Sequence, residues 1–188
     1  DADITLPDGW KPIGATKDGR VNLQKGANLN AFSGIFDGAG HTITVPEGGL
    51  PLFGYVRNTR IRNLNIYGKK IAGYGLVNNF EGVGLSGSAV EIDNVTLKSG
   101  SSTLKSGLLG ANKTVNGYAG CSAAFVATIT NCTIEKGVVV GYDKKQSQIG
   151  AIAGRMQGTI KNCVSYADVY GTDYVGGIIG TRDNAMGT

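Results

Sequence analysis

Carboxylates are the side chains of this chain with the clearest catalytic potential, because glycoside-cleaving enzymes use a pair of them. The acids that bear on this question are Asp37, Glu47, Glu81, Glu91, Asp93, Glu135, Asp143, Asp168, Asp173 and Asp183. Asp93 follows Ile92 and is expected to point outward, in a row with Arg62, Thr130 and Lys161 from equivalent positions. That row contains a single acid, so we predict no catalytic residue.

Other reactive side chains are equally isolated. His41 is the only histidine of the 188 residues and lies beside a glycine-rich turn, where a structural hydrogen-bonding role is expected. No serine or cysteine is arranged with it as a nucleophile–base pair. The three cysteines lack a Cys-x-x-Cys spacing, and no Asp-x-Asp loop indicates calcium. We therefore expect no metal and no cofactor.

Polar and aromatic residues gather in one insertion. Asn112, Lys113, Asn116 and Tyr118 supply hydrogen-bond donors and an aromatic face within one short stretch. They are the predicted binding residues, and the expected ligand is a glycan or a host protein. Ordinary drift in loop length is the alternative explanation for the insertion.

A repeat provides the elements that would position these residues. An Ile-x-Asn step recurs at Asn63, Asn94, Asn131 and Asn162, so the asparagines are 31, 37 and 31 residues apart. Inward residues follow a three-then-two spacing, as in Ile61, Leu64, Ile66. A strand has a period of two, so the phase slips at each asparagine. We predict a bent strand with asparagine at the corner, where it tolerates unusual backbone angles, and stacked asparagines bonded to one another.

A short apolar step beside glycine is the second landmark of the repeat. Eight or nine residues separate it from the next asparagine in two repeats, but sixteen separate Asn78 from Asn94 and twenty-one separate Gly110 from Asn131. The extra residues, Glu81–Ala89 and Ala111–Ala124, are expected to project side by side, as insertions on the binding face of a solenoid often do.

Charge and hydropathy exclude two classes of partner. The net charge of +4 is spread along the chain, with only two basic doublets, which is too thin for nucleic-acid binding. No apolar run approaches the ~18 residues of a transmembrane segment. Asp1-Ala2-Asp3 does not begin a signal peptide and is interpreted as a mature end or the edge of an excised segment.

Two cysteines occupy core positions of the repeat. Cys132 and Cys163 replace Leu64 and Val95, so they are expected to point inward on neighbouring coils. Buried cysteines usually behave as small hydrophobes, and a disulfide between them is the alternative. Cys121 has no such counterpart.

The two ends of the repeat array differ from its middle. Trp10 is expected to cover the first coil as part of a capping segment, with sugar stacking as the alternative. Ser165 replaces an isoleucine or leucine and weakens the last inner face. The last repeat stops before its Ile-x-Asn step, so we expect that the chain was taken from a larger parent protein, with an unusual cap at this end as the alternative.

The order of these motifs resembles bacterial surface proteins that carry the GLUG motif. The resemblance rests on Trp10-x-Pro12-Ile13-Gly14, on Phe32-x-Gly34-x-Phe36-Asp37-Gly38-x-Gly40-His41-Thr42-Ile43, on Leu52-Phe53-Gly54, on Ile61-x-Asn63-Leu64 and on the stretch Gly150–Gly180. Similar repeats occur in IgA-cleaving zinc metallopeptidases and in large extracellular adhesin-like proteins. The resemblance implies a right-handed parallel β-helix outside the cell. It does not imply proteolysis, because His-Glu-x-x-His is absent.

These observations lead to one overall prediction. We expect an all-β chain forming one right-handed parallel β-helix, a solenoid of roughly five to six coils, with residues 1–31 as an N-terminal cap and 32–188 as coils. The predicted function is a non-catalytic extracellular module of a bacterial surface protein, acting as a stalk or adhesive surface. A carbohydrate-active β-helix enzyme, a polysaccharide lyase or a glycoside hydrolase, is the alternative.

Overall fold

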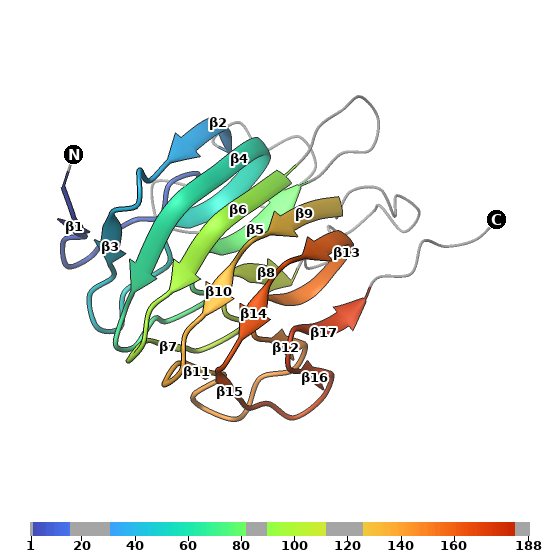
Figure 1. The fold of residues 1–188 in the computed structure, drawn as a ribbon. Coiled ribbons are helices and arrows are strands. Elements are labelled where there is room, and N and C mark those ends of the chain that lie inside the picture. Colours follow the sequence, from blue (N-terminus) through green and yellow to red (C-terminus); the bar gives the residue numbers. More distant parts are fainter. Residues whose placement is uncertain (1, 16–30, 82–89, 112–125, 183–188) are drawn as a thin grey trace.

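The computed structural model describes residues 2–15, 31–81, 90–111 and 126–182 (Figure 1). Every regular element in these ranges is a strand. The strands are β1 (Ile4–Thr5), β2 (Phe32–Asp37), β3 (Thr42–Thr44), β4 (Phe53–Tyr67), β5 (Val77–Glu81), β6 (Val90–Leu97), β7 (Ser102–Thr103), β8 (Leu109–Ala111), β9 (Val126–Thr130), β10 (Thr133–Ile134), β11 (Val139–Val140), β12 (Ile149–Gly150), β13 (Ala153–Lys161), β14 (Val164–Ser165), β15 (Asp168–Val169), β16 (Val175–Gly176) and β17 (Ile179–Arg182). The predicted all-β class is confirmed, and the described residues contain no helix that could cross a membrane.

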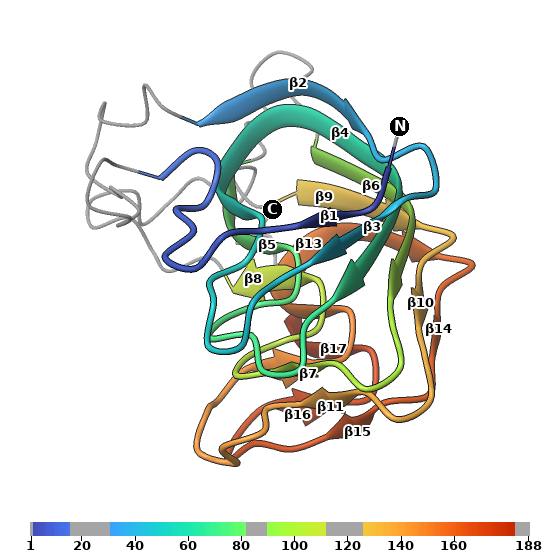
Figure 2. The same cartoon turned by 90° about the vertical axis from the view of Figure 1, so that its left-hand side faces the viewer.

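A large parallel sheet dominates the described part of the chain. Twelve strands belong to it, and β4, β6, β9 and β13 lie side by side in chain order (Figure 1). The sheet curls into a half-barrel, with β4 strongly bent (Figure 2). Two smaller parallel sheets, β7-β11-β15 and β12-β16, lie in the lower part of Figure 1.

The register of the large sheet follows the sequence repeat. Ile61 pairs with Ile92, Ile92 with Ile129, and Ile129 with Ile160, so every copy of the Ile-x-Asn step lies beside the next one. The apolar steps align in the same way, from Phe53 through Val77, Leu109 and Ala153 to Ile179. Both landmarks therefore stack in register.

The three-then-two spacing of the inward residues is explained by the asparagine. Asn63 has a φ of 52°, and the three equivalent asparagines have values of 51° to 55°. A left-handed residue turns the chain and resets which side chain faces inward. Ile61, Leu64 and Ile66 are all buried as a result, as predicted. Asparagine suits this position because its short polar side chain makes the left-handed conformation accessible.

The asparagine row is hydrogen-bonded, although not uniformly. The amide of Asn94 donates to the side-chain oxygen of Asn63 at 2.9 Å, and the amide of Asn162 donates to that of Asn131 at 3.3 Å. In the middle of the row the amide of Asn131 donates instead to the carboxylate of Asp93 at 2.7 Å. The predicted ladder is therefore correct at two steps and differs at the third, because an ionised carboxylate is a stronger acceptor than an amide oxygen.

The two ends of the stacked repeats differ in how well their apolar side chains are covered. Trp10 packs against the apolar core, and Ile13 forms a bridge with Phe53. The cap predicted for residues 1–31 stays a prediction, because residues 16–30 lie outside the described ranges. At the opposite end, Ser165 pairs with Ile134, so it occupies the position that isoleucine or leucine holds in the preceding repeats, as predicted. The exposed large apolar side chains near this end are Val164, Tyr166, Tyr170, Tyr174 and Val175.

Candidate functional site

Outward side chains of the large sheet form a first row just before the corner. Asp37, Arg62, Asp93, Thr130 and Lys161 pair in succession across five strands. The predicted row of Arg62, Asp93, Thr130 and Lys161 is confirmed, and Asp37 of β2 extends it. Because neighbouring strands lie about 4.8 Å apart, side chains in this row are close enough to bond directly.

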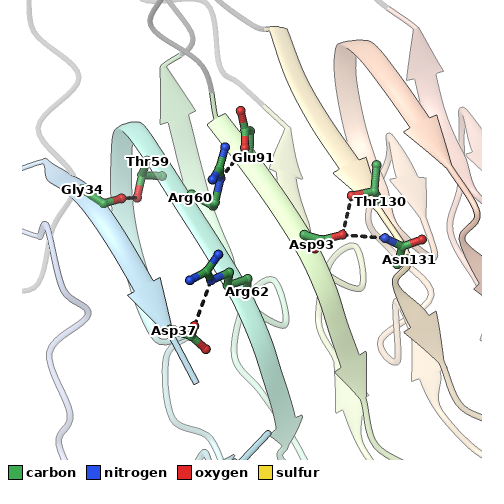
Figure 3. A network of polar contacts seen from close by, with 9 residues as sticks. All are labelled: Gly34, Asp37, Thr59, Arg60, Arg62, Glu91, Asp93, Thr130 and Asn131. Atoms are coloured by element: carbon green, nitrogen blue, oxygen red, sulfur yellow. Dashed lines mark hydrogen bonds and ion pairs between the residues drawn. The ribbon is translucent and has the colours of Figure 1, made fainter. Parts of the chain in front are cut away.

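A second row lies two residues earlier on the same strands, with Arg60, Glu91 and Thr128 in succession. Residues two apart on a strand point to the same face, so the two rows share a surface. They line an open polar groove of about 270 Å³, whose residues are Arg60, Arg62, Glu91, Asp93, Thr128 and Thr130. Figure 3 shows these residues except Thr128. We call this surface the polar groove.

Ion pairs hold both arginines of the groove. Arg60 Nε lies 2.5 Å from Glu91 Oε2, and Arg62 Nε lies 2.9 Å from Asp37 Oδ2 (Figure 3). The Glu91 carboxylate raises the pKa of the Arg60 guanidinium. Exposed ion pairs contribute little to stability, so their main effect is to orient the guanidinium groups along the groove.

Asp93 is held as an anion at the centre of the groove. Its Oδ1 accepts hydrogen bonds from the Thr130 hydroxyl at 2.6 Å and from the Asn131 amide at 2.7 Å. These two bonds, assisted by the charges of Arg60 and Arg62, lower the pKa of Asp93 below its ordinary value of 3.8. A carboxyl group with this pKa is a fixed acceptor and a poor proton donor at neutral pH.

Asp37 completes the same pattern at the edge of the groove. The backbone N–H of Ala39 donates to its carboxylate at 3.0 Å, and the Asn63 amide donates at 3.1 Å. These bonds and the neighbouring Arg62 lower the pKa of Asp37.

Thr59 directly precedes Arg60 on β4 and is buried. Its hydroxyl donates a hydrogen bond to the Gly34 carbonyl at 2.7 Å, which connects β4 to β2.

Glu91 and Asp93 are two neighbouring carboxylates of the polar groove, and this pair was not predicted from the sequence. They point to the same face of β6, and their Cα atoms lie about 7 Å apart along the strand. Glycosidases use a pair of carboxyl groups, but here the two carboxyl groups bond to different neighbours, Glu91 to Arg60 and Asp93 to Thr130. The sequence Glu91-Ile92-Asp93 contains this pair, because residues two apart on a strand share a face. The predicted row included only the residue directly before each asparagine, and Glu91 lies two residues earlier. Catalysis would also require one of the two to be protonated, which the contacts of Asp93 oppose.

The predicted binding residues Asn112, Lys113, Asn116 and Tyr118 lie outside the described residues and stay a prediction. The first residue of each predicted insertion belongs to a strand instead, because Glu81 is the last residue of β5 and Ala111 is the last residue of β8. The chain re-enters the sheet after these insertions at Val90 and Val126, one and two residues before Glu91 and Thr128 of the groove. Insertions and groove are thus adjacent along the chain.

The described residues contain no cluster of three or more histidine, cysteine, aspartate or glutamate side chains that could hold a metal ion. His41 has its Nδ1 3.5 Å from Asp3 Oδ1, and its backbone N–H donates to the Gly38 carbonyl at 2.8 Å. These contacts agree with the structural role expected for it.

Comparison with known proteins adds no family to this description. A scan against protein-family models gave no match, and searches of curated proteins and of solved structures gave none either.

Proposed function

We propose that this chain is a non-catalytic module of an extracellular bacterial surface protein, and that its polar groove binds a glycan. The curled parallel sheet is interpreted as one side of a right-handed parallel β-helix. This interpretation is supported by one observation, that successive repeats pair in parallel and in register. The right hand follows from the general rule that crossover connections between parallel strands are right-handed in nearly all proteins.

The observation that carries the proposed binding role is the composition of the groove. It presents two guanidinium groups, two carboxylates and two hydroxyls on one face, and positive and negative charges are equal in number. The ion pairs and hydrogen bonds of these groups hold them in place before a ligand arrives. Such a surface suits a neutral ligand with many hydroxyl groups, because each hydroxyl can donate to a carboxylate and accept from an arginine.

The alternative enzyme function is favoured by the Glu91–Asp93 pair alone. A glycoside hydrolase needs a protonated carboxylic acid near neutral pH, which requires a raised pKa. Asp93 has a lowered pKa, and Glu91 is paired with Arg60. Asp93 is therefore a poor proton donor, and the Glu91 carboxylate is engaged by Arg60, so binding without turnover is the better-supported function.

A glycan array with two matched variants tests the proposal. Arg62→Ala removes a groove side chain, whereas Lys161→Ala removes a cation from the same row that does not line the groove. For the glycan that the array selects, we expect Arg62→Ala to raise Kd about tenfold, because hydrogen bonds to charged groups are worth about 1.5–3 kcal/mol. Lys161→Ala should change Kd less than twofold.

Two results would contradict the proposal. Equal binding by both variants would remove the groove from the interaction, and the insertion residues would then be the site to test. Hydrolysis or elimination of a polysaccharide by the wild-type protein, lost in Glu91→Gln, would establish the enzyme alternative.

A further inference from the structure

Cys132 and Cys163 face each other across the last two copies of the Ile-x-Asn repeat. Each immediately precedes a short strand, and these strands, β10 and β14, pair in parallel with Thr133 opposite Val164. The backbone N–H of Val164 donates to the Cys132 carbonyl at 3.0 Å, which holds the two segments together. Neighbouring strands lie about 4.8 Å apart, within the Cα separation of about 4.4–6.8 Å that disulfides span.

Both sulfur atoms point into the interior, but they differ in access. Cys132 is fully buried in the core, and Cys163 is partly buried against it. Cys132 Sγ lies 3.1 Å from the Thr130 carbonyl oxygen, and Cys163 Sγ lies 3.4 Å from that of Lys161. Cys163 is therefore the sulfur that a small reagent in solvent can reach.

The two thiols shift each other's pKa in opposite directions. Their mutual side-chain interaction raises the pKa of Cys132 and lowers that of Cys163. Burial adds to the first shift and opposes the second. The more accessible sulfur is thus also the one more readily present as thiolate, the form that attacks disulfides.

We propose that Cys132 and Cys163 form a disulfide that links the last two repeats. A small disulfide such as oxidised glutathione is the oxidant. The Cys163 thiolate attacks one of its sulfurs and expels one glutathione thiolate, which gives a mixed disulfide. Cys132 then loses its proton and attacks the Cys163 sulfur, expelling the second glutathione. Two protein thiols are oxidised and one small disulfide is reduced to two thiols, so the electrons balance.

The position of this bond gives it a structural role. The repeat that contains Cys163 also carries Ser165, opposite Ile134, and has exposed apolar side chains beside it. Its packing is weaker than that of the repeats before it. A cross-link between Cys132 and Cys163 would restrain this repeat by limiting the freedom of the unfolded segment between the two cysteines.

The test uses the Cys121→Ser variant of the whole chain, so that only these two thiols remain. After treatment with oxidised glutathione, we expect the intact mass to fall by two hydrogens and a proteolytic map to join the peptides that contain Cys132 and Cys163. The unfolding midpoint should rise by about 5–10 °C and return on reduction with dithiothreitol.

Two single-thiol variants check the assigned roles. In the same background, Cys132→Ala should accumulate a glutathione adduct on Cys163, whereas Cys163→Ser should stay unmodified while folded because Cys132 is buried. The proposal is overturned if the two-thiol protein keeps both thiols free, or if it stops at a stable glutathione adduct. It is also overturned if Cys163 pairs with Cys121 in the wild-type chain. Circular dichroism confirms that each variant is folded before its mass is interpreted.

Discussion

At the scale of single residues, the corner asparagines combine two properties that are usually supplied by different amino acids. Their backbones adopt positive φ, which glycine would also accept, and their side chains bond to the neighbouring repeat, which glycine could not do. Asn131 shows that the partner can change without loss of the corner, because its amide bonds to Asp93 and its φ remains 55°. The backbone requirement is therefore the stricter of the two.

Two substitutions at Asn94 separate these contributions. Asn94→Ala loses the hydrogen bond to Asn63 and places a Cβ at positive φ, so we expect a loss of about 2–3 kcal/mol in the free energy of unfolding. Asn94→Gly loses the hydrogen bond but relieves the backbone, so a loss of about 1 kcal/mol is expected. Urea denaturation measures both, and equal losses would show that backbone strain does not matter at this corner.

At the scale of elements, glycine allows the parallel segments to approach one another closely. A Cβ built on Gly75 would lie 1.9 Å from the Gly107 carbonyl oxygen, and one on Gly107 would lie 1.8 Å from the Ala151 carbonyl oxygen. These are backbone atoms that cannot rotate away. The glycines of the apolar step therefore set the spacing between repeats, beyond any need for a tight turn.

Gly107→Ala tests this spacing. The added methyl group would force the backbones of two repeats apart, and we expect the free energy of unfolding to fall by about 3 kcal/mol, at the upper end of typical overpacking costs. Gly177→Ala is the matched control, because a Cβ there meets no atom within 4 Å. Its expected effect is within about 0.5 kcal/mol. Similar stabilities in thermal or urea unfolding would contradict the role assigned to Gly107.

At the scale of the whole molecule, a polar substitution in the interior of the sheet should destabilise the fold, whereas a deletion in a surface insertion should not. Ile134 is fully buried, and Ile134→Asp would place an unpaired charge in the interior, with an expected loss of several kcal/mol. Deletion of residues 112–119 leaves β8 and β9 intact, and both strands pair independently with β13. Because the cost of loop closure depends weakly on length, we expect that deletion to change stability little.

Both variants are compared with the wild type by circular dichroism and urea unfolding. A stable Ile134→Asp protein together with an unfolded deletion variant would show that interior and surface have been assigned wrongly. A glycan-binding assay on the deletion variant also separates the two candidate sites. Binding that survives the deletion but is weakened by Arg62→Ala belongs to the polar groove.

The sequence predicted those features that repeat along the chain. The corner asparagines, the buried triplet of Ile61, Leu64 and Ile66 and the row containing Asp93 all follow from periodicity, because parallel in-register stacking turns a sequence period into spatial adjacency. The groove was not predicted, because it joins two rows and depends on which side chains of adjacent strands bond. The bond from Asn131 to Asp93 was missed for the same reason, since acceptor strength decides between two neighbours that periodicity treats as equal.

The direction of the backbone hydrogen bonds has a mechanical consequence. In the large sheet these bonds run along the axis on which the repeats stack. Tension applied along that axis would open one row of bonds after another, whereas load applied across it would shear a whole row at once. The stack should thus resist sideways load better than lengthwise load. A repeat of 31 residues that peels from its end would lengthen the chain by about 100 Å, so the molecule would yield to lengthwise tension in long discrete steps.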